Sequence, residues 1–473
     1  MPIENGSSSK AILWSNAEQL PISVICCRNH MKSEIRQTIE RVVRNGLCTG
    51  CGTCVAICPS SAPEMVRDES KGTYLPQLDN EKCDECGICL EACPGYYVDM
   101  AGLNLEVFGK EPEDSLLGNY IGCYLAHATD SEIRYNSASG GLVTSLLIFA
   151  LEQGLIDGAL VTRMNKYSPL EPEPFIARTR EDILLSMGSK YCPVPANIAL
   201  REILERDGKY AVVGLPCHIN GIRKAEAGDE TLRERIDLHF GIFCSHTVSF
   251  DGTEYLLRKL GIRSEELAEI SYRGGGWPGR LGIRLKNGSE RFIPNLGPLW
   301  NSIFSSSFFT PSCCLSCGDV TNELADISFG DPWLPAIVKV EREGKSVVIS
   351  RSERGEALLH AAGSKGAIGL EAVDAKDVIR SQRVFLHFKK VNINWRKGPS
   401  HVSENRVDTS SRTGACFSNR LIASSTLINS RIGSSRAGRF LLRYIPLKVL
   451  RMYTNSFYKY YSRVINKYFD KSR

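Results

Sequence analysis

Two short stretches of the sequence carry four cysteines each at the same spacing. Both "CTGCGTCVAICP" and "CDECGICLEACP" read C-x2-C-x2-C-x3-C-P. In this pattern three closely spaced thiolates bind one 4Fe-4S cluster, and the fourth cysteine binds the other cluster. The spacing therefore predicts two clusters with exchanged ligands: Cys48, Cys51, Cys54 and Cys93 for the first, and Cys83, Cys86, Cys89 and Cys58 for the second.

The alternative for these eight cysteines is a pair of zinc sites, because C-x2-C pairs also occur in zinc ribbons. Zinc sites seldom contain two complete runs of this kind, each followed directly by a proline as at Pro59 and Pro94. The duplicated pattern is typical of a bacterial-type ferredoxin, which carries single electrons. The eight cysteines predict electron transfer but do not indicate what lies at either end of the route.

Ten cysteines remain, and four of them stand where strands or loops end. Cys217 follows an apolar run and a proline, Cys244 also ends an apolar run, and Cys314 and Cys317 form a C-x2-C pair. The carboxyl ends of strands are where α/β sheets place ligands. This set is enough for a third 4Fe-4S cluster. The alternatives are buried structural thiols at Cys217 and Cys244, or a zinc ion.

Alternating strand-like and helix-like runs must position these cysteines. The strand-like runs are 157–163, 210–216, 236–244 and 325–331, and the helix-like runs are 140–154 and 197–208. Such alternation predicts an α/β domain. We expect five regions: an N-terminal extension (1–44) ending in a helix, a ferredoxin-type domain (45–100), the α/β domain (115–395), a linker without periodicity (396–436) and a basic amphipathic tail (437–473).

Composition and charge limit the classes of function. Eighteen cysteines without a basic and then apolar N-terminal segment predict a reducing, cytoplasmic environment. No apolar run reaches the roughly 18–20 residues of a membrane span. From Arg431 onward eleven Lys and Arg face a single Asp470, so the preceding chain sums to −5 within a net charge of +5. This distribution argues against a general nucleic-acid binder.

The tail repeats apolar residues every three or four positions, as an amphipathic helix does. Lys459, Arg463 and Lys467 lie on roughly the opposite face. Such a helix could contact an anionic membrane surface peripherally at its inner face, dock on a partner subunit or fold back on its own domain. The apolar face consists of Leu450, Tyr453, Phe457, Tyr460, Val464 and Tyr468.

Several segments together resemble the coenzyme F-420 hydrogenase/dehydrogenase beta-subunit family over about residues 45–390. They are "SASGG" (137–141), "GSKY" (188–191), "GLPCHINGIR" (214–223), "GIFC" (241–244), "GGWPG" (275–279) and "CLSC…ELADISFGD" (314–331). Members carry FAD and iron-sulfur clusters and exchange a hydride with F-420, an 8-hydroxy-5-deazaflavin. The resemblance implies a mixed α/β flavin-binding domain between the ferredoxin-like module and the helical tail.

Carried over by residue, the resemblance implies a third 4Fe-4S cluster on Cys217, Cys244, Cys314 and Cys317. Cys313 stands beside Cys314 and is an alternative ligand, although the C-x2-C spacing favours Cys314. We expect Ser137 or Ser139 to cap a helix that begins near Gly141. The implied FAD contacts are Ser137, Ser139, Gly140, Gly141 and Lys190.

The resemblance implies an oxidoreductase that passes electrons between F-420 and one-electron acceptors through FAD and the clusters, with a redox partner protein or subunit. Hydride transfer demands no acid or base, so no catalytic side chain is assigned. Trp277, Arg273 and Arg280 are candidates for a deazaflavin cleft, or else belong to a turn around a buried tryptophan. The alternatives are a related FAD and iron-sulfur reductase acting on another substrate, for example in polysaccharide biosynthesis, and a non-catalytic electron-transfer subunit of a larger complex.

Overall fold

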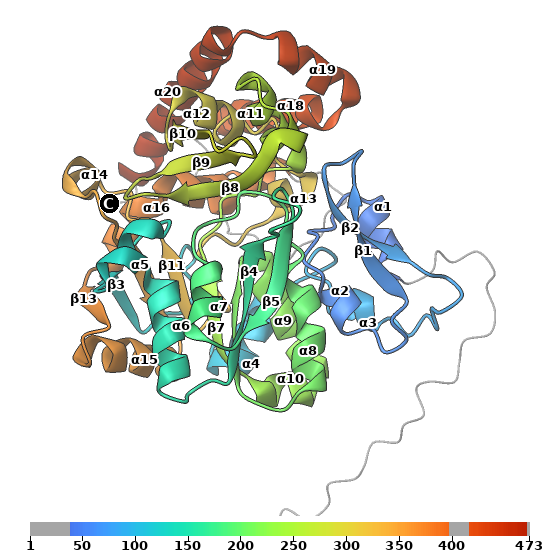
Figure 1. The fold of residues 1–473 in the computed structure, drawn as a ribbon, viewed down its shortest axis with the longest axis vertical. Helices are drawn as coiled ribbons and strands as arrows, with labels where there is room; N and C mark the ends of the chain where they lie inside the picture. Colours follow the sequence, from blue (N-terminus) through green and yellow to red (C-terminus); the bar gives the residue numbers. More distant parts are fainter. Residues whose placement is uncertain (1–37, 397–415, 471–473) are drawn as a thin grey trace, which may run out of the picture. The chain divides into compact units, whose positions relative to one another are not determined.

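The computed structural model describes residues 38–396 and 416–470. Its first part is a small module in which each cysteine run closes with a short helix, beside one antiparallel hairpin. The hairpin pairs Pro63 with Leu78, and Figure 1 shows the module in blue. Its elements are α1 (Glu40–Arg44), α2 (Thr53–Ala56), β1 (Pro63–Asp68), β2 (Thr73–Leu78) and α3 (Ile88–Glu91).

In the described part of the chain, the large domain is built on an eight-stranded sheet of order β13-β3-β12-β11-β7-β6-β4-β5. The neighbours β4, β6, β7 and β11 run parallel, whereas β3, β5, β12 and β13 pair antiparallel. The strands are β3 (Gly122–Ala128), β4 (Gly158–Met164), β5 (Pro172–Ala177), β6 (Tyr210–Gly214), β7 (Ile236–Ile242), β11 (Ile327–Gly330), β12 (Ser346–Ser350) and β13 (Ile368–Ala372).

Helices cover both faces of this sheet because successive strand side chains point to opposite sides. In β4, Ala159 and Val161 belong to a core with α6 and α15, whereas Leu160 belongs to a core with α8 and α9. The helices of this domain are α4 (Met100–Phe108), α5 (Ser131–Asn136), α6 (Leu142–Glu152), α7 (Arg180–Leu185), α8 (Leu200–Glu205), α9 (Pro216–Gly228), α10 (Glu230–Arg235), α14 (Pro335–Val340), α15 (Glu353–Ser364) and α16 (Ala375–Leu386).

A second, three-stranded antiparallel sheet of order β10-β9-β8 lies between the large sheet and the C-terminal helices in Figure 1. Its apolar residues share one core with α11 and α12. The elements here are α11 (Phe250–Lys259), β8 (Leu267–Gly274), β9 (Arg280–Leu285), β10 (Glu290–Pro294) and α12 (Pro298–Phe304). Short helical turns connect the larger elements: η1 (Ala196–Ala199), η2 (Ser264–Glu266), α13 (Ser312–Ser316), the π-helix η3 (His387–Val391) and α17 (Ile393–Arg396).

The chain ends in three helices, α18 (Cys416–Ser434), α19 (Arg436–Tyr444) and α20 (Leu447–Asp470). Of the interval expected to be an aperiodic linker, residues 397–415 lie outside the described residues, but 416–434 form α18. Ser and Asn weaken helix propensity, yet Ile422, Ala423 and Asn429 bury one face of this helix. Tertiary packing therefore overrides local composition here. No helix in the described part combines the length and apolarity that crossing a bilayer requires.

The predicted strands and helices of the α/β domain are confirmed as β4, β6, β7, β11, α6 and α8. The fold is mixed α/β with a ferredoxin-like N-terminal region and C-terminal helices. The extension predicted for residues 1–44 lies mostly outside the described residues, and only α1 represents its expected helix. The sequence analysis missed the antiparallel strands and the second sheet, and charged residues interrupt the apolar pattern in β5, β8, β9, β10 and β13.

Candidate functional site

The first cysteine group surrounds a hollow in the ferredoxin module. Cys48, Cys51, Cys54 and Cys93 line this hollow, whose empty volume is about 260 Å³. Burial raises the pKa of Cys48 and of Cys93 to about 12. The backbone N–H of Gly50 donates to Cys48 Sγ at 3.4 Å. The structure thus brings together the four cysteines predicted to share one cluster, including the one from the other run.

The second group lies in the same module but closer to solvent. Burial raises the pKa of Cys89, and the neighbouring Cys86, Cys58 and Cys83 add to the rise. Cys86 is exposed. In the described ranges no group of three or more His, Cys, Asp or Glu side chains converges on one point that could hold a single metal ion. Thiolates around a cubane each bind a different iron, so they need not converge on one point.

The third group comes from the large domain. Cys217 begins α9 just after β6, and Cys244 follows β7, its parallel neighbour in the sheet. Cys314 lies within α13, and Cys317 is the C-cap of this helix. Burial raises the pKa of Cys217 well above its usual value, and Cys51, Cys244, Cys317 and Cys314 contribute to the rise. The four predicted ligands of a third cluster are therefore neighbours.

A lysine that the sequence analysis did not identify lies at this third group. Lys389 of η3 is 2% exposed, and its Nζ donates to Cys317 Sγ at 3.2 Å and to the Asp319 carbonyl oxygen at 2.7 Å. No carboxylate among the described residues forms an ion pair with it. Cys317, Cys244 and Cys314 nevertheless raise the pKa of Lys389 despite its burial. Only the fold could reveal this residue, because it lies 72 positions beyond Cys317.

Cys313 and Cys314 form a doublet, and their thiols are in contact. The Cys313 thiol, together with the Thr247 backbone N–H and Lys389, lowers the pKa of Cys314 to about 7. The same contact with Cys314, followed by burial, raises the pKa of Cys313. Thiolates are the species that bind iron. The choice between the two cysteines rests on the C-x2-C spacing, which favours Cys314.

Asn197 in η1 joins the first group to the third. Its backbone N–H donates to the Cys51 carbonyl at 2.9 Å, and its Nδ2 donates to Thr53 Oγ1 at 2.8 Å and to the His218 carbonyl at 2.9 Å. Thr53 in turn contacts Cys51 Sγ at 3.3 Å. A side chain on Gly221 of α9 would meet Thr53 Oγ1 at 2.4 Å, so a glycine is needed for this close approach. The module is thereby packed directly against α9.

Two basic side chains of the large domain also hold the module. Arg201 Nη2 donates to the carbonyl of Cys58 at 2.8 Å and to that of Val55 at 3.2 Å. Lys224 Nζ donates to the carbonyls of Cys93, at 2.9 Å, and Tyr97. Both contacts involve carbonyls at or near predicted cluster ligands.

The residue after Cys217 is a structural histidine. His218 is 4% exposed, its Nδ1 accepts from the Leu215 N–H at 3.1 Å, and its Nε2 lies 3.0 Å from the Val194 carbonyl. Burial lowers its pKa to about 4. Both ring nitrogens have partners, so a neutral His218 fixes the start of α9.

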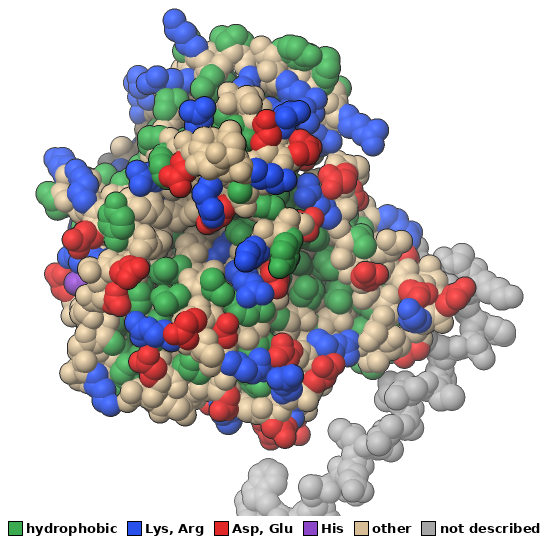
Figure 2. Space-filling view, viewed as in Figure 1, with side chains coloured by type: hydrophobic (Ala, Val, Ile, Leu, Met, Phe, Trp, Pro, Cys, Tyr) green, Lys and Arg blue, Asp and Glu red, His purple; other side chains and the backbone are tan. Residues whose placement is uncertain are grey.

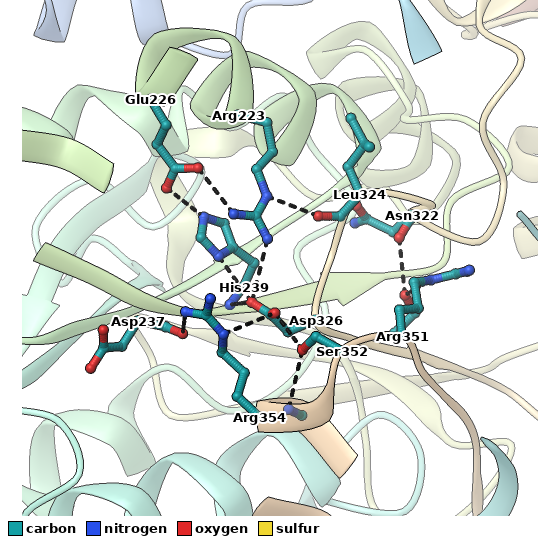
Figure 3. Close-up of polar contacts among 12 residues, drawn as sticks. Arg223, Glu226, Asp237, His239, Asn322, Leu324, Asp326, Arg351, Ser352 and Arg354 are labelled. Atoms are coloured by element: carbon teal, nitrogen blue, oxygen red, sulfur yellow. Dashed lines mark hydrogen bonds and ion pairs between the residues drawn. The ribbon is translucent and has the colours of Figure 1, made fainter. Parts of the chain in front are cut away.

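Behind the third group, a buried polar network ties α9 to the sheet. His239 of β7 is fully buried, with Nε2 at 2.7 Å from Glu226 Oε1 and Nδ1 at 3.1 Å from Asp326 Oδ2. Arg223 spans the same two carboxylates (Figure 3). The hydrogen bond with His239, and after it Arg223 and Ser352, lower the pKa of Asp326 despite its burial. The network joins the helix bearing Cys217, the strand leading to Cys244 and the chain just before β11.

The predicted FAD turn leads into α6, but its serines do not cap the helix. The helix begins at Leu142 with Gly141, at φ 75°, as its N-cap, and no side chain caps it. Ser139 Oγ donates instead to the Lys345 carbonyl at 2.6 Å. Ser137 is 5% exposed, and its Oγ has no partner among the described residues. The capping prediction was therefore wrong, and the first N–H groups of α6 have no side-chain acceptor.

The other predicted FAD residues differ in their surroundings. Gly140 has no room for a side chain, which would meet the Ala126 carbonyl at 2.7 Å. Lys190 donates through Nζ to the carbonyls of Ser186, Met187 (3.1 Å) and Gly188 (3.0 Å) at the end of α7. Burial lowers the pKa of Lys190 to about 7. Lys190 is thus not a freely solvated cation, and it forms no ion pair with the acidic residues that the structure describes.

The glycine-rich loop 273–279 lies between these two FAD segments. The Gly276 N–H donates to the Tyr135 carbonyl at 2.8 Å, and Arg273 Nη1 donates to Tyr191 Oη at 3.2 Å. Arg273 also holds Asp331 in a bidentate pair at 2.6 and 2.8 Å, and Trp277 Nε1 donates to Asp331 at 2.8 Å. Arg273 and Trp277 are buried at 3% and 2% exposure. Of the two interpretations, these contacts favour a turn around a buried tryptophan.

Thr247 links the chain segment that begins at Gly188 to the third cysteine group. Thr247 Oγ1 donates to the Cys192 carbonyl at 3.3 Å, and the Thr247 N–H donates to Cys314. The chain from Gly188 to Asn197 therefore passes the FAD candidates, then the third group, and ends at the first group.

Comparisons with known proteins agree with these motifs. The family description "coenzyme F-420 hydrogenase/dehydrogenase, beta subunit" matches through its N-terminal part at residues 123–201 and its C-terminal part at 207–376. A 4Fe-4S dicluster domain matches residues 47–95.

Three curated relatives are similar to this chain. An uncharacterized protein of Methanocaldococcus jannaschii is 30% identical over 73% of this chain and 96% of its own. The coenzyme F-420 hydrogenase subunit beta of Methanothermobacter thermautotrophicus is 28% identical over 55% of this chain and 87% of its own. The coenzyme F-420-dependent sulfite reductase of M. jannaschii is 28% identical over 77% of this chain, which spans only 53% of that protein. The chain belongs to the coenzyme F-420 hydrogenase/dehydrogenase beta-subunit family and is an electron-transfer oxidoreductase with an N-terminal 4Fe-4S domain.

Proposed function

We propose that the chain holds three 4Fe-4S clusters and one FAD, and that it transfers electrons between reduced F-420 and a one-electron partner protein. The proposal names the cofactors and substrate that the family membership leaves open. Two relatives bear F-420 in their names, and one of them is named as a subunit. We further propose that the redox partner is either another subunit of a complex or a separate protein.

The observation that carries the proposal is the third cysteine group. The buried Lys389 donates to Cys317, lies near Cys244 and Cys314, and has no carboxylate partner among the described residues. Burying an uncompensated cation is costly, and a thiolate-ligated cluster supplies the missing negative charge. The residues therefore fit a 4Fe-4S cluster held by Cys217, Cys244, Cys314 and Cys317.

The residues around the 137–141 turn fit FAD. A helix N-terminus with uncapped N–H groups favours a pyrophosphate, and the buried Ser137 hydroxyl still needs a hydrogen-bond partner. When bound, FAD supplies the conversion between two-electron hydride transfer and one-electron transfer. Gly140 and Gly141 keep side chains away from this turn, while Lys190 and the 273–279 loop bound the same region.

The contacts also support an order for the electron route. Thr247 connects the FAD region to Cys314, Asn197 connects the third group to Cys51, and Cys54 is close enough to Cys89 for their charges to interact. The second group ends the series at the exposed Cys86. Electrons would pass from FAD to the third cluster, the first, the second and then the partner.

Two other functions keep the same cofactor sites. A related reductase could use the same cofactors with a substrate other than F-420, for example in polysaccharide biosynthesis. A non-catalytic electron-transfer subunit would hold clusters without responding to any hydride donor.

The test mixes anaerobically purified protein with reduced F-420 in a stopped-flow spectrometer. We expect flavin bleaching followed by bleaching of the clusters. Intact clusters and bound FAD that ignore reduced F-420 would contradict the F-420 assignment and favour another substrate. Protein that has intact clusters but does not bind FAD would favour the function of a non-catalytic electron-transfer subunit.

A further inference from the structure

We propose that the corner between α19 and α20 is a docking surface for an anionic lipid bilayer, which the chain contacts peripherally. This inference is independent of the redox chemistry, because it concerns a part of the chain that holds none of the predicted cofactor ligands. The family profiles end at residue 376, well before these helices.

The first step is the exposure of large apolar side chains. On α19, Phe440, Leu441 and Tyr444 are 53%, 62% and 70% exposed. Tyr444 comes four residues after Phe440 and three after Leu441, and both spacings make side chains neighbours on a helix surface. At the start of α20, Val449 and Met452 are 54% and 64% exposed. About half of the large apolar side chains that the structure leaves exposed lie on α18, α19 and α20. Clustered exposure of this kind marks an interaction surface.

The second step is that the corner is firmly held on its other side. Leu442 and Leu450 are buried at 2% and 3% exposure in the core shared with α11 and α12. Lys259 Nζ donates to the Arg443 carbonyl at 2.8 Å and to the Ile445 carbonyl at 2.9 Å. Arg439 pairs with Asp251 at 3.2 Å. The apolar residues therefore face outward while their neighbours anchor both helices to the domain.

The third step is charge. Arg436, Arg443, Lys448 and Arg451 are exposed around the apolar residues and form no ion pair among the described residues. The sequence from 431 to 469 contains no Asp or Glu. Figure 2 shows hydrophobic and basic side chains gathered at the top of the view, where Figure 1 places these helices. The positively charged corner is therefore complementary to a negatively charged partner.

An anionic bilayer satisfies both requirements at once. Its interface accepts Phe, Leu, Tyr and Met side chains, while Arg and Lys extend their long stems to reach the headgroups. Each basic residue near such a surface contributes about five-fold in affinity. Leu450, Tyr460 and Val464 of the tail's predicted apolar face pack toward the domain, as the fold-back alternative predicts. The outward surface is therefore the corner rather than the length of α20.

The experiment measures co-sedimentation of the full-length holoprotein with vesicles. One set of vesicles is phosphatidylcholine alone and the other contains phosphatidylglycerol as well. The test variant is Phe440→Ser with Leu441→Ser, and the matched control is Leu105→Ser with Tyr167→Ser, which removes two apolar side chains elsewhere that are at least as exposed. Iron content and far-UV circular dichroism establish that each variant is folded.

We expect the wild type and the control to sediment with the anionic vesicles and to bind neutral vesicles at least ten-fold more weakly. The test variant should lose at least ten-fold in binding, and Arg436→Glu with Arg443→Glu should abolish the preference for anionic lipid. Wild-type protein that stays in the supernatant with both vesicles would overturn the proposal. Binding by the test variant equal to that of the wild type would also overturn it.

Discussion

The ferredoxin module and the large domain hold cysteine groups of the same size, but they assemble them differently. In the module, two contiguous runs place eight cysteines around two centres, and short turns do most of the positioning. In the large domain, Cys217 and Cys244 become neighbours only because β6 and β7 are adjacent parallel strands. Later parts of the chain supply Cys314, Cys317 and the buried Lys389. The comparison shows that local spacing specifies the cysteine groups of the module, whereas sheet topology brings together Cys217 and Cys244 of the large domain.

The largest expected effect comes from breaking the topological group. Cys217→Ala should remove the third cluster, so that iron falls from about twelve to about eight atoms per chain. Reduced F-420 should still bleach FAD. The two ferredoxin clusters should stay oxidised, because the connection between FAD and these clusters is lost. Iron analysis and stopped-flow absorbance measure both effects. Cys123→Ala removes a buried cysteine outside all three groups and serves as the control; equal iron loss in it would point to general damage.

The exchanged ligands of the module give the next effect. Cys58→Ala should abolish the same electron paramagnetic resonance signal as Cys86→Ala, although the two residues belong to different runs, because both would bind the second cluster. Cys48→Ala should abolish the other ferredoxin signal. If Cys58→Ala instead matched Cys48→Ala, each run would hold its own cluster and the pairing would be wrong.

The buried lysine should produce a smaller but specific change. Lys389→Met should lower the reduction potential of the third cluster by roughly 60–130 mV, from about 1.5–3 kcal/mol for a hydrogen bond to a charged group and 59 mV per tenfold change in a one-electron couple. The direction follows because a cation stabilises the more negative, reduced cluster. Lys389→Arg should recover most of the loss, since it keeps the charge. Redox titration followed by electron paramagnetic resonance measures these potentials, and an unchanged value in Lys389→Met would contradict the role.

The smallest effect concerns Lys190 beside the FAD region. Its pKa of about 7 means that the amine is protonated and unreactive below pH 7 and becomes nucleophilic as the pH rises through 7. An ordinary lysine reaches that point only near pH 10.4. Competitive labelling with acetic anhydride, read by mass spectrometry, should therefore show a midpoint near pH 7 for Lys190, well below that of an ordinary lysine. A midpoint near 10 for Lys190 would show that burial does not depress this amine.

The same contrast explains how much the sequence could predict. The spacing at Cys48–Cys58 and Cys83–Cys93 specified each group, since the exchange of one ligand is part of the pattern. Strands β4, β6, β7 and β11 were readable because they are buried apolar runs. Lys389, Asn197 and Thr247 were not, because nothing local distinguishes them from other polar residues, and only packing brings them to a cysteine. The serine cap failed for the same reason, since the Lys345 carbonyl competes for Ser139.

The most direct test of three clusters in one chain is a count of iron, acid-labile sulfide and zinc in wild-type protein purified without oxygen. The account predicts about twelve iron and about twelve sulfide per chain, with no stoichiometric zinc, because each of three cysteine groups holds one 4Fe-4S cluster. About eight of each would leave the large domain without a cluster and contradict the proposed route. Zinc without sulfide would contradict the cluster assignments altogether.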